Sequence, residues 1–127
     1  MKKKCTYFVL CLCILGLITA CQPSITMDDI VGVWRKNNFS PFMYLNEDGT
    51  YVISGSVGTD DPWDFGQYEF DGKTLTHHAD NESPGCPEDT DIYEVEFIDA
   101  DTLKLTTVDI QCEVVIEGET TWMRYSP

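Results

Sequence analysis

The sequence predicts an all-β domain, a small antiparallel up-and-down barrel of eight or nine strands with a short helical turn before it. Runs of five to seven residues alternate between apolar and polar side chains, as strands with one buried face do. Tight-turn signals such as Asp71-Gly72 separate these runs, and no interior stretch has the periodicity of a helix. Closing eight such strands in order would remove the exposed edges of the sheet.

The N-terminal segment has the pattern of an export signal. Three lysines at positions 2–4 precede the largely apolar stretch "CTYFVLCLCILGLITA", which is too short for a transmembrane helix of about 20 apolar residues. Ile18-Thr19-Ala20-Cys21 follows, and these residues resemble the lipobox of bacterial lipoproteins. The resemblance implies a signal peptide at 1–20, a lipidated Cys21 with a short tether at 21–29, and a barrel domain at 30–127.

This resemblance also implies a location. Several acyl chains on Cys21 would anchor the protein stably, because each buried methylene contributes about 0.8 kcal/mol. The domain would then sit in the cell envelope, on the extracytoplasmic face of a bacterial membrane. In such lipoproteins Gln22, in place of an aspartate, favours the outer membrane where the host has one. The alternative is an ordinary signal peptide followed by a chance cysteine.

The charge of the mature chain narrows the class of partner. Without residues 1–20 the chain keeps 5 basic side chains and all 22 acids, a formal net charge of −17. Nucleic acid is therefore not expected as a partner, because binding phosphates needs a basic surface. Cationic or neutral partners remain compatible with this charge.

Two cysteines remain in the mature domain besides the one at its N-terminus. They are Cys86 and Cys112, and export to an oxidising compartment predicts a disulfide between them. Closing a loop of about 27 residues would stabilise the fold by roughly 3–4 kcal/mol in the chain-entropy model. A metal site or a reactive thiol pair is the alternative, which no C-x-x-C spacing supports.

The domain is predicted to open with one helical turn at 26–30. Thr26 followed by Asp29 fits a capping box, with acids in the first turn. Strands are then expected at 31–36, 42–46 and 50–56, the last two joined by a tight turn in which Gly49 supplies the positive φ.

The central hairpin is predicted from strands at 64–70 and 73–79. The second strand contains His77 and His78, and adjacent residues of a strand point to opposite faces of the sheet. The two imidazoles are therefore poorly placed to ligate one ion. We expect one of them inside the barrel and the other in solvent.

The second half of the domain begins with the longest predicted loop, at 80–91. Its acids Glu88, Asp89 and Asp91 are expected in a solvated loop; a Ca²⁺ site is the alternative, without the spacing of an EF-hand. The remaining strands are expected at 92–98, 102–108, 112–117 and 120–126.

The two ends of the domain carry a further pattern. Gly32-x-Trp34 lies in the first strand and Arg124 in the last, and "GVWR", "FMYLNEDGTYVISG", "FGQYEFDGKTLT" and "WMRY" follow in that order along the chain. This pattern resembles the small lipocalin-like domains of bacterial lipoproteins, members of the calycin group. The resemblance implies a barrel clasp in which the Arg124 guanidinium lies over the Trp34 indole. A cation over an indole contributes about 0.5–2 kcal/mol.

The predicted function is the binding of a small apolar molecule, neutral or cationic, inside the barrel. Alternation points several aromatic side chains inward, Tyr44 among them. The residues predicted to line the ligand site are Tyr51, Trp63, Tyr68, Phe70, Tyr93 and Phe97. No cofactor or catalytic residue is expected, because no nucleophile is paired with a base or a metal cluster.

The alternative function is a protein-binding module that recognises a basic exported protein through its acidic surface. A barrel filled by side chains would favour this alternative, and an open cavity would favour the first function. Asp60, Asp61 and Asp64 surround Trp63 in the sequence and could receive a cation; otherwise Trp63 packs over the barrel mouth.

Overall fold

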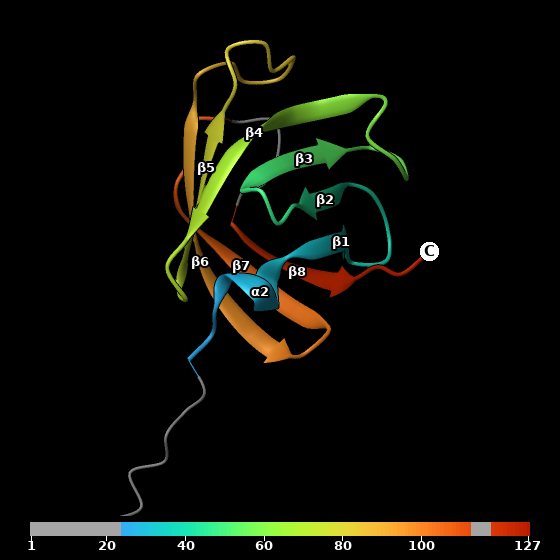
Figure 1. The fold of residues 1–127 in the computed structure, drawn as a ribbon, viewed down its shortest axis with the longest axis vertical. Coiled ribbons are helices and arrows are strands. Elements are labelled where there is room, and N and C mark those ends of the chain that lie inside the picture. The colour runs from blue at the N-terminus through green and yellow to red at the C-terminus, as the bar shows by residue number, and fades with distance from the viewer. Residues whose placement is uncertain (1–23, 113–117) are drawn as a thin grey trace, which may run out of the picture.

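The computed structural model describes residues 24–112 and 118–127, and it confirms the predicted fold class. Eight antiparallel strands close into a barrel in chain order, with β8 paired to β1 (Figure 1). A short helix, α2 (Met27–Ile30), precedes the barrel. The predicted signal peptide and Cys21 lie outside the described residues. Within the described ranges, no helix has the length and apolar character needed to cross a membrane.

The strands follow the predicted ranges closely. Their bounds are β1 Gly32–Lys36, β2 Phe42–Leu45, β3 Thr50–Ser54, β4 Pro62–Phe70, β5 Thr74–Ala79, β6 Thr90–Asp99, β7 Thr102–Asp109 and β8 Glu119–Arg124. β4 and β6 begin earlier than predicted, because Pro62 still pairs with Ser54 and Thr90 with His78. Most of the ninth strand predicted at 112–117 lies outside the described residues.

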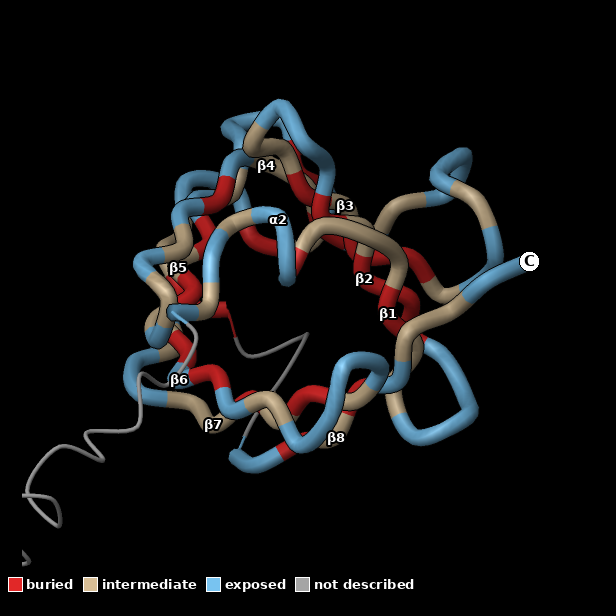
Figure 2. The backbone as a smooth tube through the Cα atoms, turned by 60° about the horizontal axis from the view of Figure 1, so that its bottom comes forward, coloured by how far each residue is buried: buried red, intermediate tan, exposed pale blue. Residues whose placement is uncertain are grey.

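The interior of the barrel is packed with side chains. In Figure 2, which looks into the barrel, buried positions recur along the strands around its wall. The core comprises Ile30, Trp34, Met43, Leu45, Tyr51, Ile53, Tyr68, Leu75, Tyr93, Val95, Leu103, Leu105 and Trp122. An eight-stranded barrel is just wide enough for side chains to fill it. The core therefore occupies the space in which a ligand was expected.

The predicted orientation of Tyr44 is wrong. It was expected to point inward, but Met43 and Leu45 are the buried residues on either side of it. Tyr44 instead accepts a hydrogen bond from the Gly58 amide, 2.6 Å from its hydroxyl oxygen. Because all four residues of β2 are apolar or aromatic, the sequence has no alternation from which the inward face could be read.

The two ends of the barrel differ in their connections. The clasp end carries α2 and the short turns at 46–49, 71–73 and 100–101. The loop end carries the longer connections at 37–41, 55–61, 80–89 and 110–118, the last described only in part. In an up-and-down barrel alternate connections must lie at the same end, so this division follows from the topology.

Candidate functional site

The clasp joins the first and last strands at one end of the barrel. The guanidinium carbon of Arg124 lies 4.2 Å from the centre of the Trp34 ring, and Trp34 is fully buried. The indole N–H donates to the Ile30 carbonyl over 2.8 Å, which fixes the ring beneath the guanidinium. A Cβ at Gly32 would come within 2.7 Å of Arg124 Nη1, and its φ of +140° also favours glycine. Gly32, Trp34 and Arg124 thus meet as the resemblance implies.

The remaining contacts of Arg124 tie three segments together. Its Nη1 donates to the Val31 carbonyl and its Nη2 to the Asp29 carbonyl, both over 2.9 Å. Its Nε and Nη2 also lie 3.4 Å from the Ala100 carbonyl, and its Nε lies 3.4 Å from a carboxylate oxygen of Asp101. The guanidinium N–H groups are directed at protein acceptors, so Arg124 links the segments before β1 and after β6 to β8.

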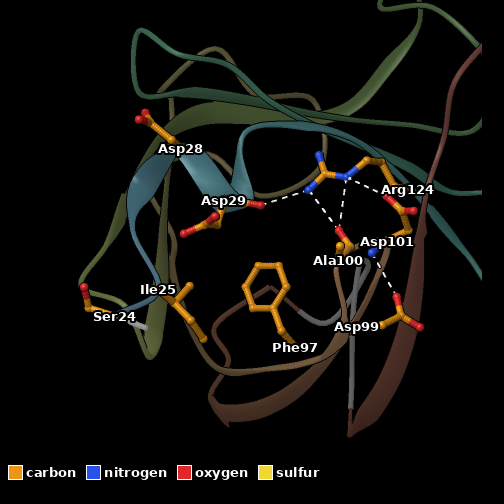
Figure 3. A pocket seen from close by; sticks show the side chains of 9 residues that line it. All are labelled: Ser24, Ile25, Asp28, Asp29, Phe97, Asp99, Ala100, Asp101 and Arg124. Atoms are coloured by element: carbon orange, nitrogen blue, oxygen red, sulfur yellow. Dashed lines mark hydrogen bonds and ion pairs between the residues drawn. The ribbon is translucent and has the colours of Figure 1, made fainter. Parts of the chain in front are cut away.

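A cleft of about 570 Å³ lies beside the clasp, between α2 and the β6–β7 turn. It is lined by Ser24, Ile25, Asp28, Asp29, Phe97, Asp99, Ala100, Asp101 and Arg124. Figure 3 shows the Phe97 ring in the middle of this cleft, with Ile25 on one side and the Arg124 clasp on the other. Phe97 also meets the edge of Trp34, with ring centres 6.1 Å apart. The cleft therefore combines an apolar floor with four carboxylates and one guanidinium.

Three of the four carboxylates in the cleft have partners within the protein: Asp29, Asp99 and Asp101, the last paired with Arg124. Asp29 accepts from the Thr26 amide over 2.8 Å and from its hydroxyl over 3.0 Å, which is the predicted capping interaction. These two hydrogen bonds lower the pKa of Asp29 below its ordinary value. Asp99 accepts from the Asp101 amide over 2.9 Å and closes the β6–β7 turn. The net charge around the cleft favours a cationic ligand over an anionic one.

A buried polar cluster lies at the opposite end of the barrel. Asp64 accepts from the Tyr51 hydroxyl over 2.7 Å and also from the Ser83 hydroxyl. Asp91 accepts from the backbone amides of Gln111 and Cys112 over 2.8 and 3.0 Å. The two carboxylates thereby hold the 80–89 and 110–112 segments over the barrel, and the Cys86–Cys112 disulfide joins these segments. The predicted disulfide is confirmed.

Burial shifts the pKa values of His77, Asp91, Tyr51 and Tyr93 in this cluster. His77 stacks on Tyr51, with ring centres 4.1 Å apart, and its Nε2 has no hydrogen-bond partner among the described residues. Burial lowers the pKa of His77 to about 3, so the imidazole is neutral. Burial likewise raises the pKa of Asp91, and burial beside the two carboxylates raises the pKa of Tyr51 and Tyr93. His78 is exposed, as expected for the neighbour of an inward histidine.

The six residues predicted to line a ligand site do not form one cavity in the described structure. Tyr51, Tyr68 and Tyr93 are at most 3% exposed and belong to the packed core. Phe70 packs against this core from the strand end, and Phe97 faces the cleft at the clasp end. The sixth residue, Trp63, lies at the outer surface near the loop end, 41% exposed.

The acids predicted around Trp63 are also divided. Asp60 and Asp61 are exposed in the β3–β4 loop, but Asp64 is 2% exposed and points into the polar cluster. Asp64 points inward because it shares the parity of Gly66 and Tyr68 in β4. A β-bulge precedes it, since Asp64 pairs with Ile53 while Pro62 pairs with Ser54. Trp63 is the extra residue of this bulge and is directed outward.

Sequence reasoning missed the acids inside the barrel and most of the cleft. The inward face that contains Tyr93 and Val95 continues back to Asp91, and the face that contains Tyr68 continues back to Asp64. Strand parity could therefore have identified both buried carboxylates. The cleft had no comparable signal, since its walls come from residues 24–29 and from the turn after β6. Among the described residues, no group of three or more His, Cys, Asp or Glu side chains is placed to hold a metal ion.

Comparison with known proteins identifies a fold but no family. No family model matches the chain, and no curated protein matches it. Among solved structures, the crystal structure of Treponema pallidum Tp0751 (pallilysin) is similar, with a TM-score of 0.55 and 11% sequence identity. The match covers 94% of this chain and 98% of that one. At this identity the similarity supports a shared small barrel fold and extends to nothing else.

Proposed function

We propose that this protein is a lipid-anchored binding module of the bacterial cell envelope, and that it recognises a basic exported protein with its outer surface. The observation that supports this most is the filled interior of the barrel, where core side chains occupy the space that a carrier would leave for its ligand. The acidic surface supplies the recognition, since a net charge of −17 on the mature chain steers cationic partners toward it.

The lipid anchor gives this module an orientation. With Cys21 acylated, only Gln22 and Pro23 separate the anchor from Ser24, at the clasp end of the barrel. The clasp end would then lie close to the membrane and the loop end would face away from it. Partners that approach from the envelope would meet the long loops first. In this proposal the module performs no catalysis, and neither a cofactor nor nucleic acid takes part.

The test is native mass spectrometry of the protein purified from its own host, in non-ionic detergent at low salt. We expect a complex with a protein of isoelectric point above about 9, which dissociates as the salt concentration rises because exposed charge pairs are screened. A stoichiometric small molecule on the barrel, with no protein partner, would contradict the proposal and support the carrier function.

A second candidate function rests on the cleft at the clasp end. The cleft has an apolar floor at Phe97 and four carboxylates at its walls. These features suit a small cationic molecule that also carries an aromatic or apolar group. This function keeps the predicted class of ligand and moves its site from the barrel interior to the outside of the clasp.

A titration with benzyltrimethylammonium would test the second candidate, with the uncharged benzyl alcohol as the matched probe. Phe97→Ala should abolish saturable binding of the cation, whereas Ile98→Ala, at the adjacent and outward-facing position, should leave it unchanged. If the charged and the uncharged probe bound with equal affinity, or if the two variants bound the cation equally well, the cleft would not be the binding site.

A further inference from the structure

Trp63 differs from the other two tryptophans of the protein. Trp34 and Trp122 are fully buried, whereas Trp63 is 41% exposed at the start of β4. It lies in a surface groove of about 400 Å³ whose other lining residues are Pro62, Pro84 and Gly85. A large aromatic side chain left exposed beside two prolines is typical of a residue that anchors a protein–protein contact.

The indole is held in a fixed position. A Cβ at Gly55 would come within 2.3 Å of the Trp63 ring, so only glycine allows the ring to lie against the backbone there. A Cβ at Gly85 would likewise come within 2.5 Å of the Trp63 carbonyl oxygen. Gly85 is followed by Cys86, which the disulfide ties to Cys112. Two close backbone contacts and a covalent crosslink therefore preorganise this groove, which lowers the entropy lost on binding.

The loops that border the groove carry charge of one sign. The segments 55–61 and 80–89 contain no lysine or arginine. Their acids are Asp60, Asp61, Asp80, Glu82, Glu88 and Asp89. Within the described ranges, none of these six carboxylates forms an ion pair with a basic side chain. An exposed indole face with an unneutralised acidic surround complements a cation and disfavours an anion.

We infer that the Trp63 groove is the surface on which the basic partner protein docks, with an arginine or lysine side chain over the indole and acids at the rim. This inference rests on the proposed function and gives it a location. Arginine suits the site better than lysine, because its planar guanidinium stacks on an aromatic face and loses less hydration. The groove adjoins the loop end, the end that the lipid anchor would direct away from the membrane.

The test uses the processed protein in nanodiscs of neutral lipid and a defined probe, the peptide acetyl-Arg-Gly-Arg-Gly-Arg-amide. Its matched control replaces each arginine by citrulline, which keeps the shape and removes the charge. Calorimetry at low salt gives the affinity, and acrylamide quenching of fluorescence reports on Trp63, the exposed tryptophan. We expect the arginine peptide to bind and to protect Trp63 from the quencher, and the citrulline peptide to do neither.

Variants then separate the groove from the general charge of the surface. Trp63→Ala should weaken binding by about 5- to 30-fold, the equivalent of losing a partly desolvated cation–π contact, and Trp63→Phe should weaken it less. Phe39→Ala removes an aromatic side chain that is 76% exposed on another loop, and it should leave the affinity within about twofold. Asp60→Asn with Asp61→Asn should weaken binding more than Glu94→Gln with Glu96→Gln, which removes the same charge from the barrel wall.

The outcomes distinguish this inference from the proposed function. Undiminished binding by both Trp63 variants would overturn the docking site while leaving recognition by the acidic surface in place. Equal weakening by the two charge-matched double variants would overturn the acidic rim in the same way. Absence of binding to the unmodified protein at low salt would overturn the proposed function itself.

Discussion

The clasp end and the loop end each contain a tryptophan, and the surroundings of the two residues differ. At the clasp end, Trp34 is fully buried under a guanidinium that is directed at protein acceptors. At the loop end, Trp63 has an exposed ring, acids nearby and no cation over it among the described residues. The same residue type closes the fold at one end and is available to a partner at the other. This contrast supports the proposal that a partner docks at the loop end, whereas Trp34 and Arg124 join the first and last strands of the barrel.

The largest expected effect is from Trp34→Ala. Removing a fully buried indole should reduce the free energy of unfolding by about 3–5 kcal/mol, since the cavity left behind cannot collapse completely between paired strands. Chemical denaturation of the processed chain measures this loss. Trp63→Ala is the matched substitution at the other end, and it should change the free energy by less than about 1 kcal/mol. Similar losses in the two variants would end the contrast between the two tryptophans.

Removal of the disulfide should destabilise the loop end selectively. Cys86→Ala with Cys112→Ala reopens a loop whose ends are 26 residues apart, which should cost about 3–4 kcal/mol in the chain-entropy model. Amide hydrogen exchange should then show lost protection in 80–89 before β1 and β8 are affected. Simultaneous loss of protection at both ends would show that the disulfide stabilises the barrel as a whole.

Substitution of Arg124 should have a smaller effect, confined to the clasp end. Arg124→Ala removes the contact with Trp34 and the hydrogen bonds to two carbonyls before β1, with an expected cost of about 2–3 kcal/mol. Arg124→Lys keeps the charge but not the planar fork, so it should recover only part of this loss. Thermal unfolding midpoints of the two variants measure the difference. Full recovery with lysine would show that charge alone closes the barrel.

The sequence was sufficient to predict the regular parts of this molecule. Alternating strands and Gly-containing turns predicted the barrel, because side-chain parity and positive φ are local properties. The disulfide was predicted from the two cysteines that lie outside the predicted signal peptide and lipidation site. Trp34 and Arg124 are distant in sequence, but both residues lie in strands that a closed barrel must pair.

The parts that were not predicted depend on contacts between segments or on irregular backbone. The apolar run of β2 has no alternation, so the direction of Tyr44 was decided by packing. Trp63 was expected at the mouth of the barrel, but it lies at the irregular start of β4, next to the bulge, and is 41% exposed. The inward directions of Tyr51, Tyr68 and Tyr93 were correctly identified. Whether such side chains fill a barrel or leave space depends on the sum of their volumes, and no single residue carries that information.

At neutral pH the smallest expected effect is that of the polar cluster at the loop end, which appears as a dependence on pH and grows as the pH falls. The pKa of His77 is lowered to about 3 by burial, whereas in the unfolded chain it takes its ordinary value of 6.5. The unfolded state therefore binds one more proton than the folded state between these values, and stability falls as the pH falls from about 6.5 toward 3. The slope due to this one group approaches about 1.4 kcal/mol per pH unit.

His77→Phe isolates this contribution. Phenylalanine can keep the stacking on Tyr51, and the imidazole Nε2 that is lost has no partner among the described residues. At pH 7 the variant should be as stable as the unmodified protein or slightly more stable. Urea denaturation between pH 6 and 4 should show a pH dependence that is shallower in the variant by up to the slope of one proton.

The raised pKa of Asp91 acts in the opposite direction and remains in both proteins, so it cancels in the comparison. His78→Phe, at the exposed neighbouring position, is the matched control, and its pH dependence should stay close to that of the unmodified protein. If both variants kept the original slope, the acid sensitivity would have to come from carboxylates elsewhere in the barrel, and the loop end would be no more responsive to pH than the clasp end.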